Sequence, residues 1–202
     1  MHKLRTGYTA NTKKSFMLGE GAIFKNFVVG TDTYASAITA GKLLGATQGG
    51  STFNVTANVR NIEIDGIAGK VVDLDEIDSW DVSLQTTFIE TTVATIQAAL
   101  GASSKDTTAV NGYTKITGDL DFEASDYFTN IVFVGSMSGS DDPIILELDN
   151  AIGNGSLSIN IKNNDEGKIP VTFEGRYSIS SLGTVPFAIW VPDVPASSGS
   201  GT

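Results

Sequence analysis

The chain contains no cysteine and only one histidine, His2, in 202 residues. The absence of cysteine excludes disulfide frameworks, thiolate metal sites and cysteine nucleophiles. A single histidine beside the N-terminus leaves no base for a Ser-His-Asp triad and no histidine set for a metal ion. Because these residue types carry so much of enzyme chemistry, we expect a protein that is not an enzyme and has no cofactor or metal.

Charge is scarce as well. Only 18% of the residues are charged, and 23 acidic against 13 basic side chains give a net charge of −10. Nucleic-acid binding depends on Lys and Arg contacts with phosphates, so this balance opposes it. Hydrophobic residues make up 41% of the chain, which is enough for a core and excludes a disordered acidic chain. A surface with so little charge indicates contact with other subunits.

Long apolar runs are also missing. The longest are a few residues, as in Ile131–Val134, whereas a membrane helix needs about 20. The N-terminal stretch is basic and polar, and no signal-peptide core follows it. We therefore expect a chain that is made in a cytoplasm and enters no membrane.

What the sequence does contain is strand patterning. Residues 79–89 alternate, with Trp80, Val82, Leu84, Thr86 and Phe88 on one face. Residues 53–64 alternate too, but their phase slips near Arg60 and Asn61, which indicates a β-bulge or a switch between sheets. Further strands are expected at residues 18–29, 127–134, 144–148, 156–161, 169–180 and 187–191.

One helix is expected between Thr91 and Gly101. Thr91 or Thr92 caps its start, the apolar residues recur at helical spacing, and Gly101 ends it. Residues 30–50 form a long connection of small residues, of the kind that is usually functional or mobile. The predicted organisation is an N-terminal arm (1–17), a β domain (18–192) and a flexible C-terminal tail (193–202).

The loop at residues 65–78 is strongly acidic. A calcium loop of the EF-hand type starting at Asp73 fails, because Ile77, Asp78 and Leu84 occupy positions that need an oxygen ligand, a glycine and a glutamate. The carboxylate pairs Asp119/Asp121 and Glu147/Asp149 have the strand spacing of a shared face, but nothing distinguishes them as a glycosidase pair. A solvated acidic loop is the simplest interpretation.

Taken together, several segments resemble the major tail tube protein of long non-contractile-tailed (siphovirus-type) bacteriophages. They occur in order across residues 18–192: GAIFKNF (21–27), GATQGGSTF (45–53), VRNIEIDG (59–66), the tryptophan-led strand at 79–89, the helix at 91–101, IPVTFEGRY (169–177) and PFAIWVP (186–192). Residues 71–78 depart from the family pattern by being more acidic.

The resemblance implies a mainly β, tail-tube-type β-sandwich or barrel with one packed helix (about 91–101), a long inter-strand loop and extended terminal arms. It implies hexameric rings that stack into a tube through which DNA passes without specific binding. Its other partners would be tape-measure and tail-tip or terminator proteins. The chain would be made in the bacterial host cytoplasm and located in the virion, as part of the phage tail.

In the resembled family the loop between the two long strands reaches the adjacent ring. This implies Leu74 and Ile77 as apolar anchors and Lys70 as a salt-bridge donor, within an acidic loop that contains Asp73, Asp75, Glu76 and Asp78. On this basis, Leu74→Asp is predicted to block stacking and to leave the subunit folded.

Three alternatives stay open. The inner tube of a contractile tail, or of a tail-derived bacteriocin, shares the tube fold. A carbohydrate-binding host-adhesion β-sandwich belongs to a different class and needs exposed aromatic side chains on one face. An enzyme is the third alternative, and the residue composition described above opposes it.

Overall fold

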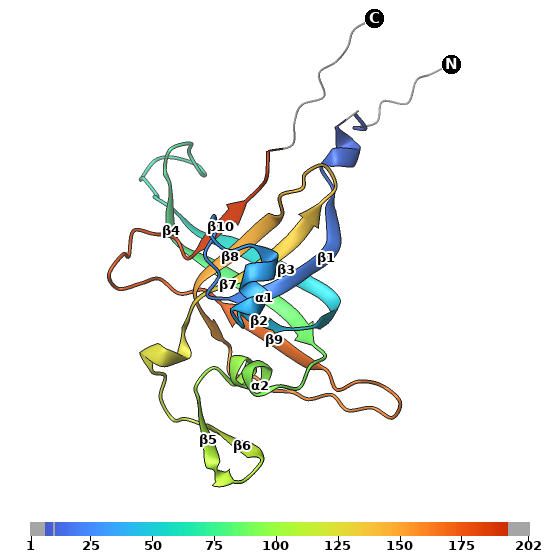
Figure 1. The fold of residues 1–202 in the computed structure, drawn as a ribbon. Coiled ribbons are helices and arrows are strands. Elements are labelled where there is room, and N and C mark those ends of the chain that lie inside the picture. The colour runs from blue at the N-terminus through green and yellow to red at the C-terminus, as the bar shows by residue number, and fades with distance from the viewer. Residues whose placement is uncertain (1–6, 10, 194–202) are drawn as a thin grey trace, which may run out of the picture.

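The structure, a computed structural model, describes residues 7–9 and 11–193. It is mainly β, as predicted, with an antiparallel sheet in the order β2-β1-β7-β8-β9-β4-β3 and with β10 paired to β8 (Figure 1). The strands of this sheet are β1 (Met17–Lys25), β2 (Leu43–Gly45), β3 (Thr47–Asn61), β4 (Asp75–Phe88), β7 (Phe128–Met137), β8 (Ile144–Gly153), β9 (Ile169–Glu174) and β10 (Phe187–Trp190).

The sheet folds into two layers at β8. Residues 145–148 of β8 pair with β10, whereas Ile152 and Gly153 pair with β9. Between these two stretches Asn150 has a left-handed backbone, with φ 45°. One layer therefore consists of β2, β1, β7, β8 and β10, and the other of β9, β4 and β3.

The main core lies between the two layers. The alternation predicted for β4 is confirmed, because Val82, Leu84, Thr86 and Phe88 are all buried. They join apolar side chains from both layers, among them Ile23, Ile131, Phe133, Leu148, Val171 and Phe173. Trp80 is half-buried and packs at the margin of this core, where its ring lies 5.5 Å from that of Phe187. Each Å² of apolar surface that is removed from water stabilises the fold by about 25 cal/mol, and this burial holds the two layers together.

Helix α2 (Val93–Leu100) contacts the ends of β8 and β9 and confirms the predicted helix. Thr92 caps it: the Thr95 N–H donates to Thr92 Oγ1 (3.1 Å), and the Thr92 N–H donates to Thr95 Oγ1 (2.9 Å). Gly153 on β8 allows the helix to approach closely, since a Cβ there would lie 1.9 Å from the Ala98 carbonyl oxygen. Any larger residue at position 153 would push the helix away.

Helix α2 is the one substantial helix, and a second helix of six residues lies in the long connection. Residues 30–50 contain α1 (Tyr34–Thr39), β2 and the first residues of β3, and are not merely a connection of small residues. Helix α1 covers the outer face of the first layer, where Ala37 packs in a separate cluster with Phe24, Phe27 and Val132. The capping box of α1 joins Thr33 and Ser36, a pairing that the sequence analysis did not consider.

A two-stranded hairpin, β5 (Ser103–Val110) and β6 (Tyr113–Gly118), was missed altogether. It projects from the body beyond α2 (Figure 1). Its signal was present, because Asn111-Gly112 between Val110 and Tyr113 is a favoured hairpin turn, and Gly112 has φ 83°. Two short 3₁₀ segments, Thr12–Lys14 (η1) and Ala124–Asp126 (η2), complete the described elements.

Other predicted boundaries also differ. The strand expected at residues 156–161 is wrong, since that segment makes only one bridge, between Asn160 and Lys168. The last long strand ends at Glu174 and not at Ser180. The first begins at Met17, close to the predicted end of the arm, and residues 194–202 of the predicted tail lie outside the described residues. Among the described residues, none of the helices has the length and apolar character needed to cross a membrane.

Candidate assembly surface

Strands β3 and β4 form a long ribbon of which only one half contributes to the core. In the near half, Phe53, Val55, Val82 and Leu84 face the other layer. The pairing then shifts between Asn58 and Val59, where β4 has one extra residue, Asp78. An irregularity thus lies close to the one predicted near Arg60, but its extra residue is on β4 and not on β3. Beyond this shift the side chains no longer have a second layer to pack against.

We call residues 59–78 the distal ribbon. Its large apolar side chains are exposed to solvent, from Val71 at 36% to Val72 at 84%. They are Val59, Ile62, Ile64, Ile67, Val71, Val72 and Ile77. Single exposed apolar residues are ordinary, but a contiguous group of this size on one projecting element indicates an interaction site.

The tip of the distal ribbon is an ordered turn region. Gly66 and Gly69 adopt φ of 87° and 94°, and Asp73 is one of the few non-glycine residues with a left-handed backbone, at φ 70°. The Ile62 N–H donates to the Leu74 carbonyl oxygen (2.8 Å), which closes the loop at the strand ends. The loop therefore ends at Leu74 and not at Asp78 as expected.

This shorter loop changes the setting of the predicted contact residues. Asp75, Glu76, Ile77 and Asp78 lie in β4, with Ile77 opposite Val59 on β3. Ile77 is 54% exposed, as an apolar anchor requires, whereas Leu74 is half-buried. Their part in an inter-ring contact stays a prediction.

Charges on the distal ribbon are mostly acidic. Arg60 donates to Glu76 and, at 3.3 Å, to Asp78 across the strand pair. The Asn61 side-chain amide donates to Asp75 (2.7 Å). Lys70 is exposed and forms no ion pair with any of residues 7–9 and 11–193. These exposed pairs are each worth about 0–1 kcal/mol, so they orient side chains more than they stabilise the fold.

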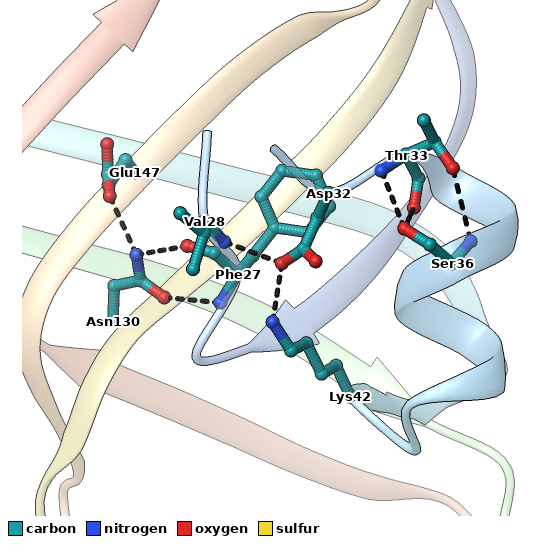
Figure 2. A network of polar contacts seen from close by, with 8 residues as sticks. All are labelled: Phe27, Val28, Asp32, Thr33, Ser36, Lys42, Asn130 and Glu147. Atoms are coloured by element: carbon teal, nitrogen blue, oxygen red, sulfur yellow. Dashed lines mark hydrogen bonds and ion pairs between the residues drawn. The ribbon is translucent and has the colours of Figure 1, made fainter. Parts of the chain in front are cut away.

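A second candidate surface is the segment from Val28 to Lys42 on the opposite layer. Figure 2 shows how polar contacts fix it. Asn130 on β7 accepts from the Phe27 N–H (2.8 Å) and donates to the Phe27 carbonyl oxygen (2.8 Å) and to Glu147 (2.7 Å). Asn130 is only 6% exposed, so its side chain replaces a strand partner for the backbone of Phe27.

Asp32 holds the other end of this segment. It accepts from the Val28 N–H (2.7 Å) and from Lys42 Nζ (2.5 Å). The hydrogen bond from Lys42, followed by that from Val28, lowers the pKa of Asp32 below its ordinary value. The result is a rigid platform on which Val28, Tyr34 and Ile38 expose apolar surface. None of these contacts between distant segments was predicted.

The outward face of β3, β4 and β9 has a distinct chemistry. Its side chains on β3 and β4 are Thr52, Asn54, Thr56, Asn58, Ser79, Asp81, Ser83, Gln85 and Thr87. On β9 the same face carries Pro170, Thr172 and Glu174, and Glu174 pairs with Arg176 just beyond the strand. The same alternation places one cationic side chain, Arg60, farther along β3, and it is paired with Glu76 and Asp78. The face is therefore hydrophilic but has no unpaired cation on these strands for a phosphate.

Two hollows of the surface are candidate ligand sites. A groove of about 1500 Å³ runs along the free part of β1 and the start of β3, and Tyr34 and Trp190 line it. A smaller hollow of about 300 Å³ is lined by Asp149 and by hydroxyl side chains such as Thr129 and Ser181. Burial, and then the negative charge of Glu147, raise the pKa of Asp149 above its ordinary value.

The carboxylates do not form a metal centre. Among residues 7–9 and 11–193, no group of three or more His, Asp or Glu side chains is placed to hold a metal ion. Asp119 and Asp121 lie after β6 in an exposed segment, and Glu147 is engaged by Asn130 and by the Trp190 Nε1–H (2.8 Å). In comparisons with known proteins, no family model and no curated protein matched this chain.

Proposed function

We propose that the chain is a structural subunit that assembles with copies of itself into hexameric rings, and that the rings stack into the hollow tail tube of a bacteriophage. The observation that carries the proposal is the β3–β4 ribbon. Within the described structure, the 15 residues of β3 pair only with β4, so its outer edge is free along its whole length. A long free edge with little charge is a template for pairing with another chain.

Ring closure would use this edge. If β3 of one subunit pairs with a strand of the next, the layers that contain β9, β4 and β3 join around the ring in one closed sheet, which has no free edges. Such a head-to-tail contact forms a ring when its rotation closes, and a second head-to-tail contact between rings propagates as a filament. The exposed apolar side chains of the distal ribbon are suited to that second contact.

The outward face of β3, β4 and β9 would then line the tube. A lining of Thr, Asn, Ser and Gln with a few carboxylates would let DNA pass without binding, because the one cationic side chain on these three strands, Arg60 of β3, is already paired with Glu76 and Asp78. The protein in this role is a virion component with no catalytic step. It would meet the tape-measure and tail-tip or terminator proteins at the ends or in the bore of the tube.

The test is electron microscopy of the purified protein beside a variant without the tip. Asn61 and Asp75 are directly paired, so replacing residues 62–74 by Asn-Gly closes the hairpin with a two-residue turn. None of residues 62–74 belongs to the core clusters, so the variant should stay folded. Hollow rods or annuli from the wild type and single rings or monomers from the variant support the proposal. A strictly monomeric wild type at high concentration contradicts it.

A carbohydrate-binding host-adhesion module is the second candidate. Trp190 and Tyr34 are half-exposed and line the same groove, where Asp141 and Asp142 supply hydrogen-bond acceptors. Aromatic faces beside carboxylates are able to stack on sugars and accept from their hydroxyls. Glycan binding by the isolated subunit that is lost in Trp190→Ala would favour this candidate. The inner tube of a contractile tail shares the proposed assembly and would be distinguished by a sheath around it.

A further inference from the structure

The charges of the chain are divided unequally between its N-terminal sequence and the distal ribbon. Residues 1–16 contain four basic side chains, Lys3, Arg5, Lys13 and Lys14, and no acidic one. The distal ribbon contains six acidic side chains and two basic ones, a net charge of 2 − 6 = −4. We infer that the basic N-terminal arm of one copy docks on the apolar, acidic distal ribbon of another copy. This inference rests on the proposed self-assembly and names the partner surface of its ribbon contact.

The root of the arm is fixed on the body. The Phe16 N–H donates to Ser138 Oγ (3.1 Å), the Ser138 N–H donates to the Phe16 carbonyl oxygen (2.9 Å), and Ser138 Oγ donates to the Lys13 carbonyl oxygen (2.5 Å). Lys13 and Lys14 therefore start from a defined position on the 3₁₀ segment η1.

The arm also matches the ribbon in its apolar residues. Tyr8 and Phe16, 59% and 51% exposed, are the described large apolar side chains of the arm. The distal ribbon exposes seven large apolar side chains and has no second layer over them. Apolar contact would supply most of the free energy, and the opposite charges would select partner and orientation.

The arrangement within one subunit favours contact between copies. In Figure 1 the distal ribbon projects at the upper left, and η1 projects at the upper right, on the other side of the sheet. The root of an arm and the ribbon of its own subunit thus stand apart. When subunits repeat along a filament, each arm meets the ribbon of a neighbour, which makes this a head-to-tail contact.

Charge reversal tests the inference. A variant with all four basic residues of the arm reversed should need an at least about tenfold higher protein concentration for assembly, which corresponds to about 1.4 kcal/mol. Its substitutions are Lys3→Glu, Arg5→Glu, Lys13→Glu and Lys14→Glu. Glu63→Lys with Asp65→Lys on the exposed tip should weaken assembly in the same direction. A protein that carries both sets should recover, because the charges are exchanged and not removed. Sedimentation velocity at low salt measures all three.

The control is Lys105→Glu with Lys115→Glu, two exposed lysines of the β5–β6 hairpin. It changes the net charge in the same sense without touching the arm or the ribbon, so assembly should follow the wild type. The inference would be overturned if this control lost assembly to the same extent as the arm variant. It would also be overturned if the protein with both the arm and the ribbon substitutions did not recover assembly. If the variant with reversed charges on its arm forms rods as readily as the wild type, the inference is also overturned, while the proposed tube itself stands.

Crosslinking tests directly whether the arm contacts the ribbon of another copy. The chain has no cysteine of its own, so introduced cysteines react without competition. One protein carries Gly7→Cys and a second carries Val72→Cys, and the two are mixed and treated with a short thiol crosslinker. Both positions are exposed, so neither change disturbs the core. A crosslinked pair of one chain of each kind, formed in preference to like pairs, supports the inference. Like pairs alone, or uncrosslinked chains, overturn it even if the wild type forms no rods.

Discussion

The two halves of strand β4 both pair with β3 but have opposite surroundings. In the near half Leu84 is 1% exposed between two layers, whereas in the distal half Ile77 is 54% exposed. Both lie in a regular antiparallel pair with β3, opposite Phe53 and Val59 respectively. Strand formation is thus independent of burial here, and the distal half keeps an apolar surface that the subunit itself does not cover.

This contrast separates what stabilises the subunit from what is available for a partner. A lone two-stranded hairpin is marginal in water, so the distal ribbon depends on the near half for its shape. Its own exposed apolar groups add little to folding because they stay in contact with solvent. Substitutions in the near half should therefore lower the free energy of unfolding, and substitutions in the distal half should leave it nearly unchanged.

The largest effect is expected for Leu84→Ala in the near half. Removal of a fully buried leucine from the core should lower the free energy of unfolding by about 2–5 kcal/mol. Ile77→Ala on the same strand is the matched control and should change it by less than about 0.5 kcal/mol. Urea unfolding followed by circular dichroism measures both. A similar loss of unfolding free energy in the two variants would contradict the proposal that only the near half of the ribbon stabilises the fold.

The next largest effect is expected for Asn130→Ala. It leaves the buried N–H and carbonyl oxygen of Phe27 without the partners shown in Figure 2 and should cost about 1–3 kcal/mol. Asn58→Ala is the control from the ribbon: Asn58 also makes two side-chain hydrogen bonds, to Ser79 and Asp81, but in solvent. Chemical denaturation that ranks Asn58→Ala as the more costly change would contradict this assignment.

The sequence predicted the elements whose signals are local. Alternation identified β4, and a capping threonine and a terminal glycine identified α2. A phase slip near Arg60 pointed to the irregular part of the β3–β4 pair, although the extra residue proved to be Asp78 on β4. Each depends on residues within a few positions of one another. The fold class followed from the same signals, because alternation over many short segments is typical of a β-sandwich.

What was missed depends on distant or two-sided surroundings. Strand β5 is exposed on both faces beyond Ser103, and β6 has only two half-buried residues, Thr114 and Ile116, so the pair has little apolar alternation to detect. The Asn111-Gly112 turn is what marks it. Asn130 lies 103 positions from Phe27, so their contact is invisible in one sequence. The acidic stretch 75–78 suggested a loop by composition, but cross-strand contacts from Arg60 and Asn61 to these carboxylates accompany its pairing as a strand.

A smaller, pH-dependent effect is expected for Asp149→Asn. The folded-state pKa of Asp149 is raised, so the stability it contributes is fully present below its unfolded-state pKa, near 3.8, and is lost as the pH rises through the folded-state pKa. The asparagine variant lacks that loss. It should be more stable than the wild type at neutral pH, and the difference should shrink toward pH 4. A difference that is constant across this range would contradict the raised pKa.

The smallest effect on folding, and the largest on assembly, is expected for Ile77→Asp. The side chain is exposed, so the free energy of unfolding should stay within about 0.5 kcal/mol of the wild type. Leu74→Asp should also block stacking but cost more stability, because Leu74 is half-buried. Tubes counted by electron microscopy, beside unfolding curves of the same samples, give both quantities. Normal tubes from Ile77→Asp would show that the exposed apolar surface of the distal ribbon is not a contact, and the contrast between the two halves of β4 would then concern folding alone.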